Sequence, residues 1–558
     1  MLEFKLSKKV SSSITIDRPD ESRIKKAIKN DSLNQYGIIK PLVVDVLSVD
    51  NRMADTKDLI YYGLNIVAKD GKSIGLQFND FFIKEDCELL IFDRITRKIL
   101  TSKRTFHNQK HGQYSIYELK SNNVDILFIG SAQNISESRL KLKSIIYGYK
   151  SSSMTNKDGL KDCHIHVNCA SWLPDHIEKN NVRSVFKYYI DDKTCTGALI
   201  RQAVDDPNNL EPIFLTARHC IHVGSSGGGS LVDLDNSQFQ FNFNLPPNCN
   251  GSAPSYTMYP MNGGGYSSTR LYMLNSQGSI LIDESPYLGS DLALLKMNEK
   301  PQPHFKAYYS GWSASVLQNV SNSHFYGIHH PKGDLKRTSR VFGPSVVSLI
   351  GRYSVFWQNG VTQKGSSGSP LFNSNGRIIG GLSGGTSGCV IPGPDFYGKF
   401  RYFWLFQSDV RNALNPLGQF TISEPGDEIY CYSNSYLSLF GQYYPSKIYQ
   451  SNNEIDIRSS NVIVGGMGED FDSELRIYDE ANFTFYAKNE IILKPGFKAE
   501  RGAEFKAIIQ DCTSETVRRS VNQKSAKISF RTEKEYNDYL KSESDKLKTD
   551  RKLKINDR

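Results

Sequence analysis

The chain has 558 residues, of which 39% are hydrophobic and 11% aromatic, and its formal net charge is +9. This length exceeds what one hydrophobic core usually supports, so we expect two to four domains. The small net charge gives no reason to expect a nucleic-acid partner. The sequence has no run of about 18 apolar residues, which excludes a membrane-spanning helix.

Residues 1–54 form a polar, weakly patterned segment. Its first nine residues lack the apolar core of a secretory signal, so we expect that a signal was trimmed or that the true start is missing. Residues 55–150 alternate in short hydrophobic runs, for example at 59–67, which predicts a β-sandwich-like domain. Residues 151–162 follow as an exposed linker.

Residues 163–415 contain many short strand-like runs separated by glycine-rich loops, and 424–514 form a second strand-rich module. The loops at 224–230 and 263–265 lack the Gly-Lys-Ser/Thr opening of a helix, so we interpret them as surface turns and not as phosphate sites. The charged tail at 515–558 mixes acidic with basic residues, which favours a solvated, partly helical or disordered segment over a nucleic-acid-binding one.

The sequence Gly-Ser-Ser-Gly-Ser-Pro at 365–370 is typical of a nucleophilic serine. Such a serine needs a tight turn, because its hydroxyl must stand clear while backbone N–H groups converge on the oxyanion formed in acyl transfer. Gly365 and Gly368 permit that turn. We therefore predict Ser367 as the nucleophile, with the N–H groups of Gly365 and Ser367 as oxyanion donors.

A general base and its carboxylate partner occur upstream of this turn. His219 follows the hydrophobic run 213–217, and Asp291 opens a leucine-rich run. Asp291 alone would be an ordinary residue at the start of a strand. The order His219, Asp291, Ser367 is, however, that of chymotrypsin-type enzymes, which predicts a Ser-His-Asp triad that needs no metal ion or cofactor.

Six of the nine cysteines lie between 163 and 389, around the predicted catalytic residues. This clustering favours disulfides and an oxidising compartment. The alternative is a zinc site in the segment 163–169, but its spacing matches no structural zinc pattern. Cys431 and Cys512 bracket the C-terminal module, and we expect a bridge between them.

Residues from about 158 to 410 resemble the bacterial lysyl endopeptidase family, a secreted branch of the chymotrypsin-fold serine proteases. The motifs that carry the resemblance are 195–199, 214–220, 327–331, 365–370, 384–385 and Cys389. The resemblance implies an all-β chain. A double β-barrel chymotrypsin-like protease domain is flanked by the β-sandwich-like domain and the small C-terminal β module.

The resemblance also implies three disulfides in the protease domain. They join Cys163 to Cys389, Cys169 to Cys249, and Cys195 to Cys220. Cys87, in the first domain, is left as an unpaired thiol. Ser366 stands where trypsin-like zymogens carry an aspartate, so activation by a salt bridge to a new N-terminus is not expected.

Substrate choice is expected to depend on Asp395, which falls on the family's position for the aspartate that recognises lysine. A desolvated carboxylate rejects neutral side chains because binding them would leave its charge unpaired. Without the resemblance, Asp395 would be a loop aspartate after Pro394. Ser383, grouped with the substrate-binding residues, stands where relatives have histidine. This departure bears on catalytic rate and pH optimum.

The N-terminal domain resembles the prodomains attached to such proteases, and Lys157 lies in the linker. An enzyme that cuts after lysine would process itself there, making Asp158 the new first residue. The C-terminal module is similar to β-repeat modules of secreted bacterial proteins, which suggests surface attachment or binding. His329 and His330 are interpreted as structural, because consecutive strand residues point to opposite faces.

These observations together predict a secreted or cell-surface serine endopeptidase that cleaves proteins and peptides on the carboxyl side of lysine. One alternative is broader Lys/Arg specificity, which a single aspartate does not exclude. The other is an adhesin or binding protein that retains a protease fold without using it.

Overall fold

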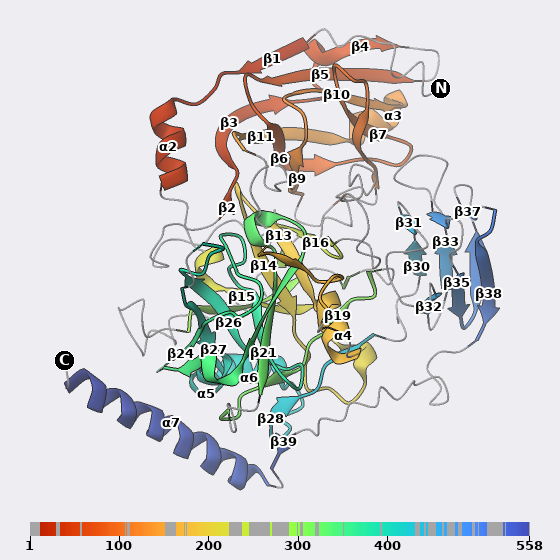
Figure 1. Ribbon diagram of the computed structural model, residues 1–558. Coiled ribbons are helices and arrows are strands. Elements are labelled where there is room, and N and C mark those ends of the chain that lie inside the picture. The colour runs from red at the N-terminus through yellow and green to blue at the C-terminus, as the bar shows by residue number, and fades with distance from the viewer. Residues whose placement is uncertain are drawn as a thin grey trace.

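The computed structural model describes residues 12–29, 34–150, 163–221, 237–244, 268–269, 290–429 and 528–556 and the strands between 436 and 510, with short gaps inside these ranges. Figure 1 shows the chain from the N-terminal domain to the C-terminal helix. The linker with Lys157, the two glycine-rich loops, Cys249 and the Cys431/Cys512 pair lie outside the described residues.

The N-terminal domain is a sandwich of two sheets. One sheet contains, in spatial order, β1 (Ser12–Ile16), β5 (Ile60–Ala68), β10 (Asn123–Gly130), β7 (Glu88–Asp93) and β8 (Ile99–Lys103), with β4 (Arg52–Asp55) beside β5. The other contains β3 (Gly37–Asp45), β11 (Arg139–Gly148), β6 (Ser73–Phe82) and β9 (Tyr114–Leu119). The inner faces bury a shared apolar core that includes Ile66, Leu76 and Ile126.

The sandwich begins well before residue 55. Strands β1 and β3 come from the segment expected to be polar, and they pair with β5 and β11 respectively. In β1 exposed residues alternate with partly exposed ones, and most of β3 after its first two residues does the same. A strand with one face in water carries too many polar residues to be recognised from hydrophobicity alone.

The protease domain is built from two further sheets, and the predicted double β-barrel is confirmed. The first contains β16 (Gln238–Gln240), β13 (Val185–Ile190), β14 (Lys193–Leu199), β15 (Ile213–Ala217), β18 (Leu292–Met297) and β17 (Ser268–Thr269), with β2 (Asn34–Gln35) on β14. The main path of the second is β12 (Ile165–His166), β22 (Arg337–Phe342), β21 (His324–His329), β25 (Pro370–Asn373), β26 (Ile378–Gly385), β20 (Trp312–Ser313), β28 (Thr421–Glu424) and β39 (Ile528–Ser529). Strands β23 (Val346–Ser348), β24 (Arg352–Val355) and β27 (Asp395–Lys399) complete it.

Strand pairing brings the predicted catalytic segments together. β15 pairs with β18 in antiparallel register, with Ala217 opposite Leu292, so the segments just beyond the paired ends lie side by side. Ser367 lies in the turn that leads into the strand β25, and β25 pairs with β26 so that Pro370 is opposite Gly381. The two sheets share a buried core that includes Leu215, Leu292 and Phe372. The site therefore lies where the two sheets meet.

Four described helices accompany the protease sheets and its C-terminal extension: α4 (His176–Ser184), α5 (Phe400–Phe406), α6 (Ser408–Leu414) and α7 (Glu533–Asn556). The helix α7 comes from the charged tail, and its N-terminal half packs on the protease domain (Figure 1). Tyr536 is buried in the protease core, and the Arg401 guanidinium donates to Tyr539 and Glu543. No described helix is long and apolar enough to cross a membrane.

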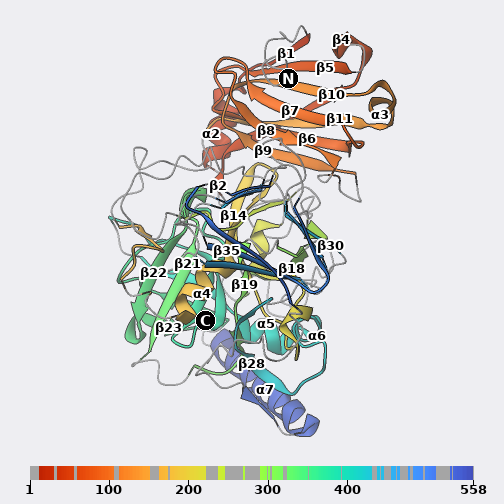
Figure 2. The ribbon, with the colours of Figure 1, turned by 90° about the vertical axis from the view of Figure 1, so that its right-hand side faces the viewer.

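The C-terminal module winds as a parallel β-solenoid, which lies beside the protease domain in Figure 1 and in front of it in Figure 2. Its three sheets are β30 (Tyr436–Leu439), β33 (Val462–Gly465) and β36 (Glu490–Leu493); β31 (Gln442–Tyr444), β34 (Leu475–Ile477) and β37 (Phe497–Ala499); and β32 (Glu454–Ser459), β35 (Asn482–Ala487) and β38 (Glu504–Ile509). All six pairings are parallel. Ile457, Phe483 and Phe485 are buried inside.

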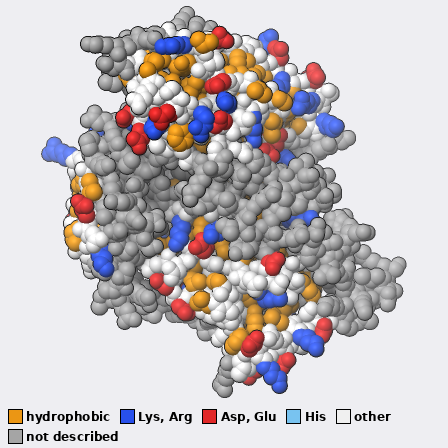
Figure 3. Space-filling model, turned by 180° about the vertical axis from the view of Figure 1, so that it is seen from behind, with side chains coloured by type: hydrophobic (Ala, Val, Ile, Leu, Met, Phe, Trp, Pro, Cys, Tyr) orange, Lys and Arg blue, Asp and Glu red, His pale blue; other side chains and the backbone are white. Residues whose placement is uncertain are grey.

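Acidic and basic side chains are interspersed over the described surface of the N-terminal domain and of the C-terminal part when the molecule is seen from behind (Figure 3). This agrees with the small net charge of the chain.

The packing of α7 gives a testable prediction. Tyr536→Ala should weaken the docking of this helix by about 2 to 4 kcal/mol, because it leaves a cavity in a shared core. Hydrogen exchange across the N-terminal half of α7 should become faster. Lys541→Ala, on the exposed face of the same helix, is the matched control. Equal exchange in both variants would contradict the described packing.

Candidate active site

His219 and Asp291 form a tight pair at the ends of β15 and β18. The imidazole Nδ1 lies 2.6 Å from Asp291 Oδ2, and the backbone N–H of His219 donates to Oδ1 over 3.1 Å. Both carboxylate oxygens are therefore engaged with one residue. Because Nδ1 faces the carboxylate, Nε2 is the ring nitrogen left for proton transfer.

Burial and charge act in opposite directions on this pair. Burial alone would lower the pKa of His219, but the Asp291 carboxylate outweighs it and the pKa is raised. Burial would raise the pKa of Asp291, but the His219 ring and two hydrogen-bond donors outweigh it and the pKa is lowered. The carboxylate thus stays ionised and stabilises a protonated imidazole.

Ser383 lies on this pair and not on the predicted specificity residue. Its hydroxyl donates to Asp291 Oδ2 over 2.6 Å. The structure thus joins Ser383 to the pair of His219 and Asp291, whereas the sequence grouped it with the substrate-binding residues. The bond accounts for part of the lowered pKa of Asp291. A short-range pattern in the sequence could not reveal it, because 92 residues separate the two.

The turn 365–370 is held by backbone hydrogen bonds to both sheets. The N–H of Thr196 donates to the Ser367 carbonyl over 2.9 Å, and its hydroxyl donates to the Gly365 carbonyl over 2.9 Å. The Gly368 N–H donates to the Leu382 carbonyl over 2.9 Å. Within the described part of the chain, the N–H groups of Gly365 and Ser367 donate to no protein acceptor. These two groups are the predicted oxyanion donors.

Both glycines of the turn adopt conformations that other residues rarely take. Gly365 has a φ of +90° and Gly368 a φ of +85°. A Cβ on Gly368 would also collide with Thr216 and lie 2.7 Å from the Ala217 N atom. Glycine is therefore required at this position by both backbone conformation and space.

His329 supports the turn from behind. Its Nδ1 lies 2.9 Å from Ser366 Oγ and its Nε2 lies 3.0 Å from Ser339 Oγ. The ring of His330 instead donates through Nδ1 to the Asp334 carbonyl over 2.8 Å. Burial lowers the pKa of both histidines well below the ordinary value, so both rings are neutral.

Asp395 is buried, with 1% of its surface exposed. Its Oδ2 accepts three hydrogen bonds, from Trp357 Nε1 at 2.6 Å, Thr362 Oγ1 at 2.7 Å and Ser387 Oγ at 2.8 Å. Its Oδ1 has no hydrogen-bond partner among the described residues. Burial raises the pKa of the carboxyl despite these donors. The sequence missed the three donors, since they lie 38, 33 and 8 residues from Asp395.

Comparison with known proteins identifies the domain. Residues 158–398 match the family model described as lysyl endopeptidase, C-terminal domain. This segment belongs to the lysyl endopeptidase family. This match places the domain in a serine protease family.

Solved structures of several proteases are also similar to the chain. A Glu endopeptidase is 16% identical over 40% of this chain and 89% of its own, with a TM-score of 0.27. The thermostable serine protease AL20 from an extremophilic microorganism is 14% identical over 43% and 98%, with a TM-score of 0.28. The active form of the Rv3671c protease from M. tuberculosis is 13% identical over 41% and 81%, with a TM-score of 0.25.

Two of the disulfides expected for a lysyl endopeptidase are present. Cys163 is joined to Cys389 and Cys195 to Cys220. Cys169 is also disulfide-bonded, and its expected partner Cys249 lies outside the described residues. The sulfur atoms of Cys163 and Cys389 lie close to His164, but their bond leaves no thiolate there for zinc. Cys87 is a free, buried thiol, as expected.

The position of Ser383 in this lysyl endopeptidase domain gives a paired prediction. Ser383→Ala should lower kcat by about tenfold or more with little change in KM, because a hydrogen bond to a charged group contributes about 1.5 to 3 kcal/mol. Ser387→Ala is the matched variant, and it should raise KM for a lysine substrate while leaving kcat nearly unchanged. Steady-state kinetics of both variants separate the two roles. A rise in KM with unchanged kcat for Ser383→Ala would contradict this role and would indicate that Ser383 contributes to substrate binding.

Proposed function

We propose that the protein is a secreted serine endopeptidase that cleaves on the carboxyl side of lysine. The observation that supports lysine is the buried Asp395, with one oxygen held by three neutral donors and the other without a partner. A cation is the ligand that such a carboxylate favours, because the charge is otherwise uncompensated. Glutamate or aspartate at the same position would be repelled.

The three hydrogen bonds that hold Oδ2 favour lysine over arginine. A guanidinium binds a carboxylate best through two parallel hydrogen bonds, which need both oxygens. Trp357, Thr362 and Ser387 already occupy Oδ2. An ammonium is a compact charge that one oxygen can accept. Lysine therefore fits the arrangement without breaking an existing bond.

The proposed chemistry combines the hydrogen-bonded pair of His219 and Asp291 with the glycine turn that carries Ser367. Ser367 Oγ attacks the scissile carbonyl while His219 Nε2 takes the hydroxyl proton. The N–H groups of Gly365 and Ser367 bind the resulting oxyanion, and the loss of one such donor typically costs about 3 to 4 kcal/mol. His219 then gives the proton to the leaving amine. Water, activated by the same ring, hydrolyses the acyl-enzyme and frees Ser367.

Secretion is supported by the disulfides, since such bonds persist in oxidising compartments. The N-terminal domain is proposed to be a prodomain, removed by cleavage after Lys157. The solenoid at the C-terminus is proposed to attach the enzyme to a surface. Neither proposal needs a cofactor.

Digestion of a denatured test protein tests the triad and the specificity together. Wild type should yield fragments that end in lysine, and Ser367→Ala should yield none, because acyl transfer requires the nucleophile. Mass spectrometry of the fragments is the readout, and the same spectra show whether only the wild-type chain is cut after Lys157. Fragments ending equally in lysine and arginine would contradict the specificity. A chain that a fluorophosphonate does not label at Ser367 would be a binding protein.

The raised pKa of Asp395 predicts how lysine recognition changes with pH. As the pH falls through this pKa, the carboxyl becomes neutral and loses its attraction for an ammonium. As the pH is lowered, KM for a lysine peptide should therefore begin to rise at a higher pH than it would with an ordinary aspartate. The pKa of an ordinary aspartate is about 3.9. KM for a norleucine peptide should stay level. Asp395→Asn is the control, and its KM for lysine should be high at all pH values.

A further inference from the structure

A segment of the N-terminal domain enters the first sheet of the protease. In β2, Asn34 and Gln35 pair antiparallel with Thr194 and Lys193 of β14. Asn34 Nδ2 donates to Thr194 Oγ1 over 2.9 Å, and Gln35 Nε2 donates to Asp192 Oδ2 over 2.7 Å. The backbone N–H of Tyr36 donates to the Asp192 carbonyl over 2.9 Å. β2 is thus an additional strand at the edge of β14, and both backbone and side-chain hydrogen bonds hold it there.

This added strand lies directly beside the oxyanion turn. A Cβ placed on Gly365 would be 3.2 Å from Asn34 Cβ. Two residues along β14 from Thr194, Thr196 holds the carbonyls of both Gly365 and Ser367. Asn34 is 4% exposed, so the edge of β14 at this point is covered.

An extended substrate would need the same edge. Its scissile carbonyl is fixed by the N–H groups of Gly365 and Ser367, and its lysine is directed to Asp395. Each following residue advances the chain by about 3.3 Å, so the next two or three residues pass the flank of Gly365. Extended peptides bind proteins by adding a strand to an exposed sheet edge. The edge of β14 beside Gly365 is where such a strand would pair, and β2 occupies it.

Aromatic packing keeps the N-terminal domain on this edge. Tyr189, on β13 of the protease, stacks on Tyr117 with ring centroids 5.4 Å apart and meets Tyr36 edge-on at 6.0 Å. The Tyr189 hydroxyl donates to Glu118 Oε2 over 3.1 Å. Tyr189 is 2% exposed. Tyr36 and Tyr117, which contact its ring, both belong to the N-terminal domain. These contacts are noncovalent and involve no residue of the linker 151–162.

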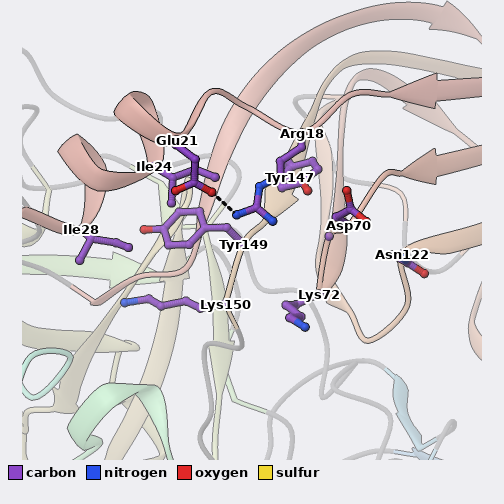
Figure 4. A pocket seen from close by; sticks show the side chains of 11 residues that line it. Arg18, Glu21, Ile24, Ile28, Asp70, Lys72, Asn122, Tyr147, Tyr149 and Lys150 are labelled. Carbon is purple, nitrogen blue, oxygen red and sulfur yellow. Dashed lines mark hydrogen bonds and ion pairs between the residues drawn. The ribbon is translucent and has the colours of Figure 1, made fainter.

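The N-terminal domain also contains a cavity, which is separate from this edge. It has a volume of about 640 Å³, and Arg18, Glu21, Tyr149 and Lys150 are among the residues that line it. Figure 4 shows the Arg18 guanidinium paired with Glu21 inside it. Its lining carries charges of both signs, including this ion pair.

We propose that the edge of β14 beside Gly365 binds the substrate residues that follow the cleaved lysine, and that β2 occupies it as an intramolecular competitor. The N-terminal domain is then an inhibitor that an extended substrate must displace. This inference rests on the proposed function, since it assigns the regulation of the same site.

Peptide binding to the full chain carrying Ser367→Ala tests the proposal without cleavage. One labelled peptide ends in a lysine amide, and a second continues for three alanines beyond the lysine. Asn34→Ala with Gln35→Ala removes the side-chain bonds that β2 donates to Thr194 and Asp192. Asn122→Ala with Gln133→Ala, elsewhere on the same domain, is the matched control. The first pair should tighten binding of the longer peptide by about tenfold, and that of the shorter peptide by less than about twofold.

Equal affinity of the longer peptide for all three proteins would overturn the competition. A different outcome would be that both lysine peptides bind all three proteins no more tightly than the same peptides with norleucine in place of lysine. That outcome would contradict the proposed lysine specificity, and it would not bear on the role of β2.

Hydrogen exchange gives a second test that needs no substitution in β2. Saturating the Ser367→Ala chain with the longer peptide should accelerate exchange of the Tyr36 amide, because its bond to the Asp192 carbonyl breaks. The shorter peptide should leave it protected, and the amide of Ile126, in the sandwich core, should not change with either peptide. Unchanged exchange at Tyr36 under saturation would overturn the proposal.

Discussion

The pairing of β15 with β18 is the constraint on which the active-site geometry depends. It places Ala217 opposite Leu292, and His219 follows Ala217 by two residues while Asp291 directly precedes Leu292. A shift of one residue in this register would turn every side chain of the strand to the opposite face. The close approach of Gly398 to Ser290, where a Cβ would collide with the backbone, fixes the same segment from the second sheet. The pair of His219 and Asp291 is thus positioned by both sheets.

Two buried aspartates in this domain have opposite properties for one physical reason. Asp291 faces an imidazole that becomes positively charged, and its pKa is lowered in spite of burial. Asp395 faces only neutral donors, and burial raises its pKa. Burial disfavours the charged form of both, and only a partner charge reverses that effect. A structural partner completes the first site, whereas the proposed substrate ammonium would complete the second.

Segments from outside the protease domain cover edges of its sheets. Strand β2 covers β14 from the N-terminal side of the chain, and β39 covers β28 from the C-terminal side. Open strand edges attract other extended chains, so a protease that binds extended peptides must keep one such edge accessible when active. The two added strands differ in position. β2 lies beside the turn with the predicted oxyanion donors, whereas β39 belongs to the segment that leads into α7.

The sequence alone determined the features that depend on short-range chemistry. The turn at 365–370, the hydrophobic run before His219 and the order of the three motifs identified the reaction class, because a nucleophile turn requires glycine in fixed positions. The β-rich class and two of the disulfides also followed from local pattern and resemblance. Tertiary structure alone decided which distant side chains meet. It placed Ser383 on Asp291, three donors on Asp395 and Asn34 beside Gly365. These contacts join residues many positions apart, and a local pattern carries no information on strand register between distant segments.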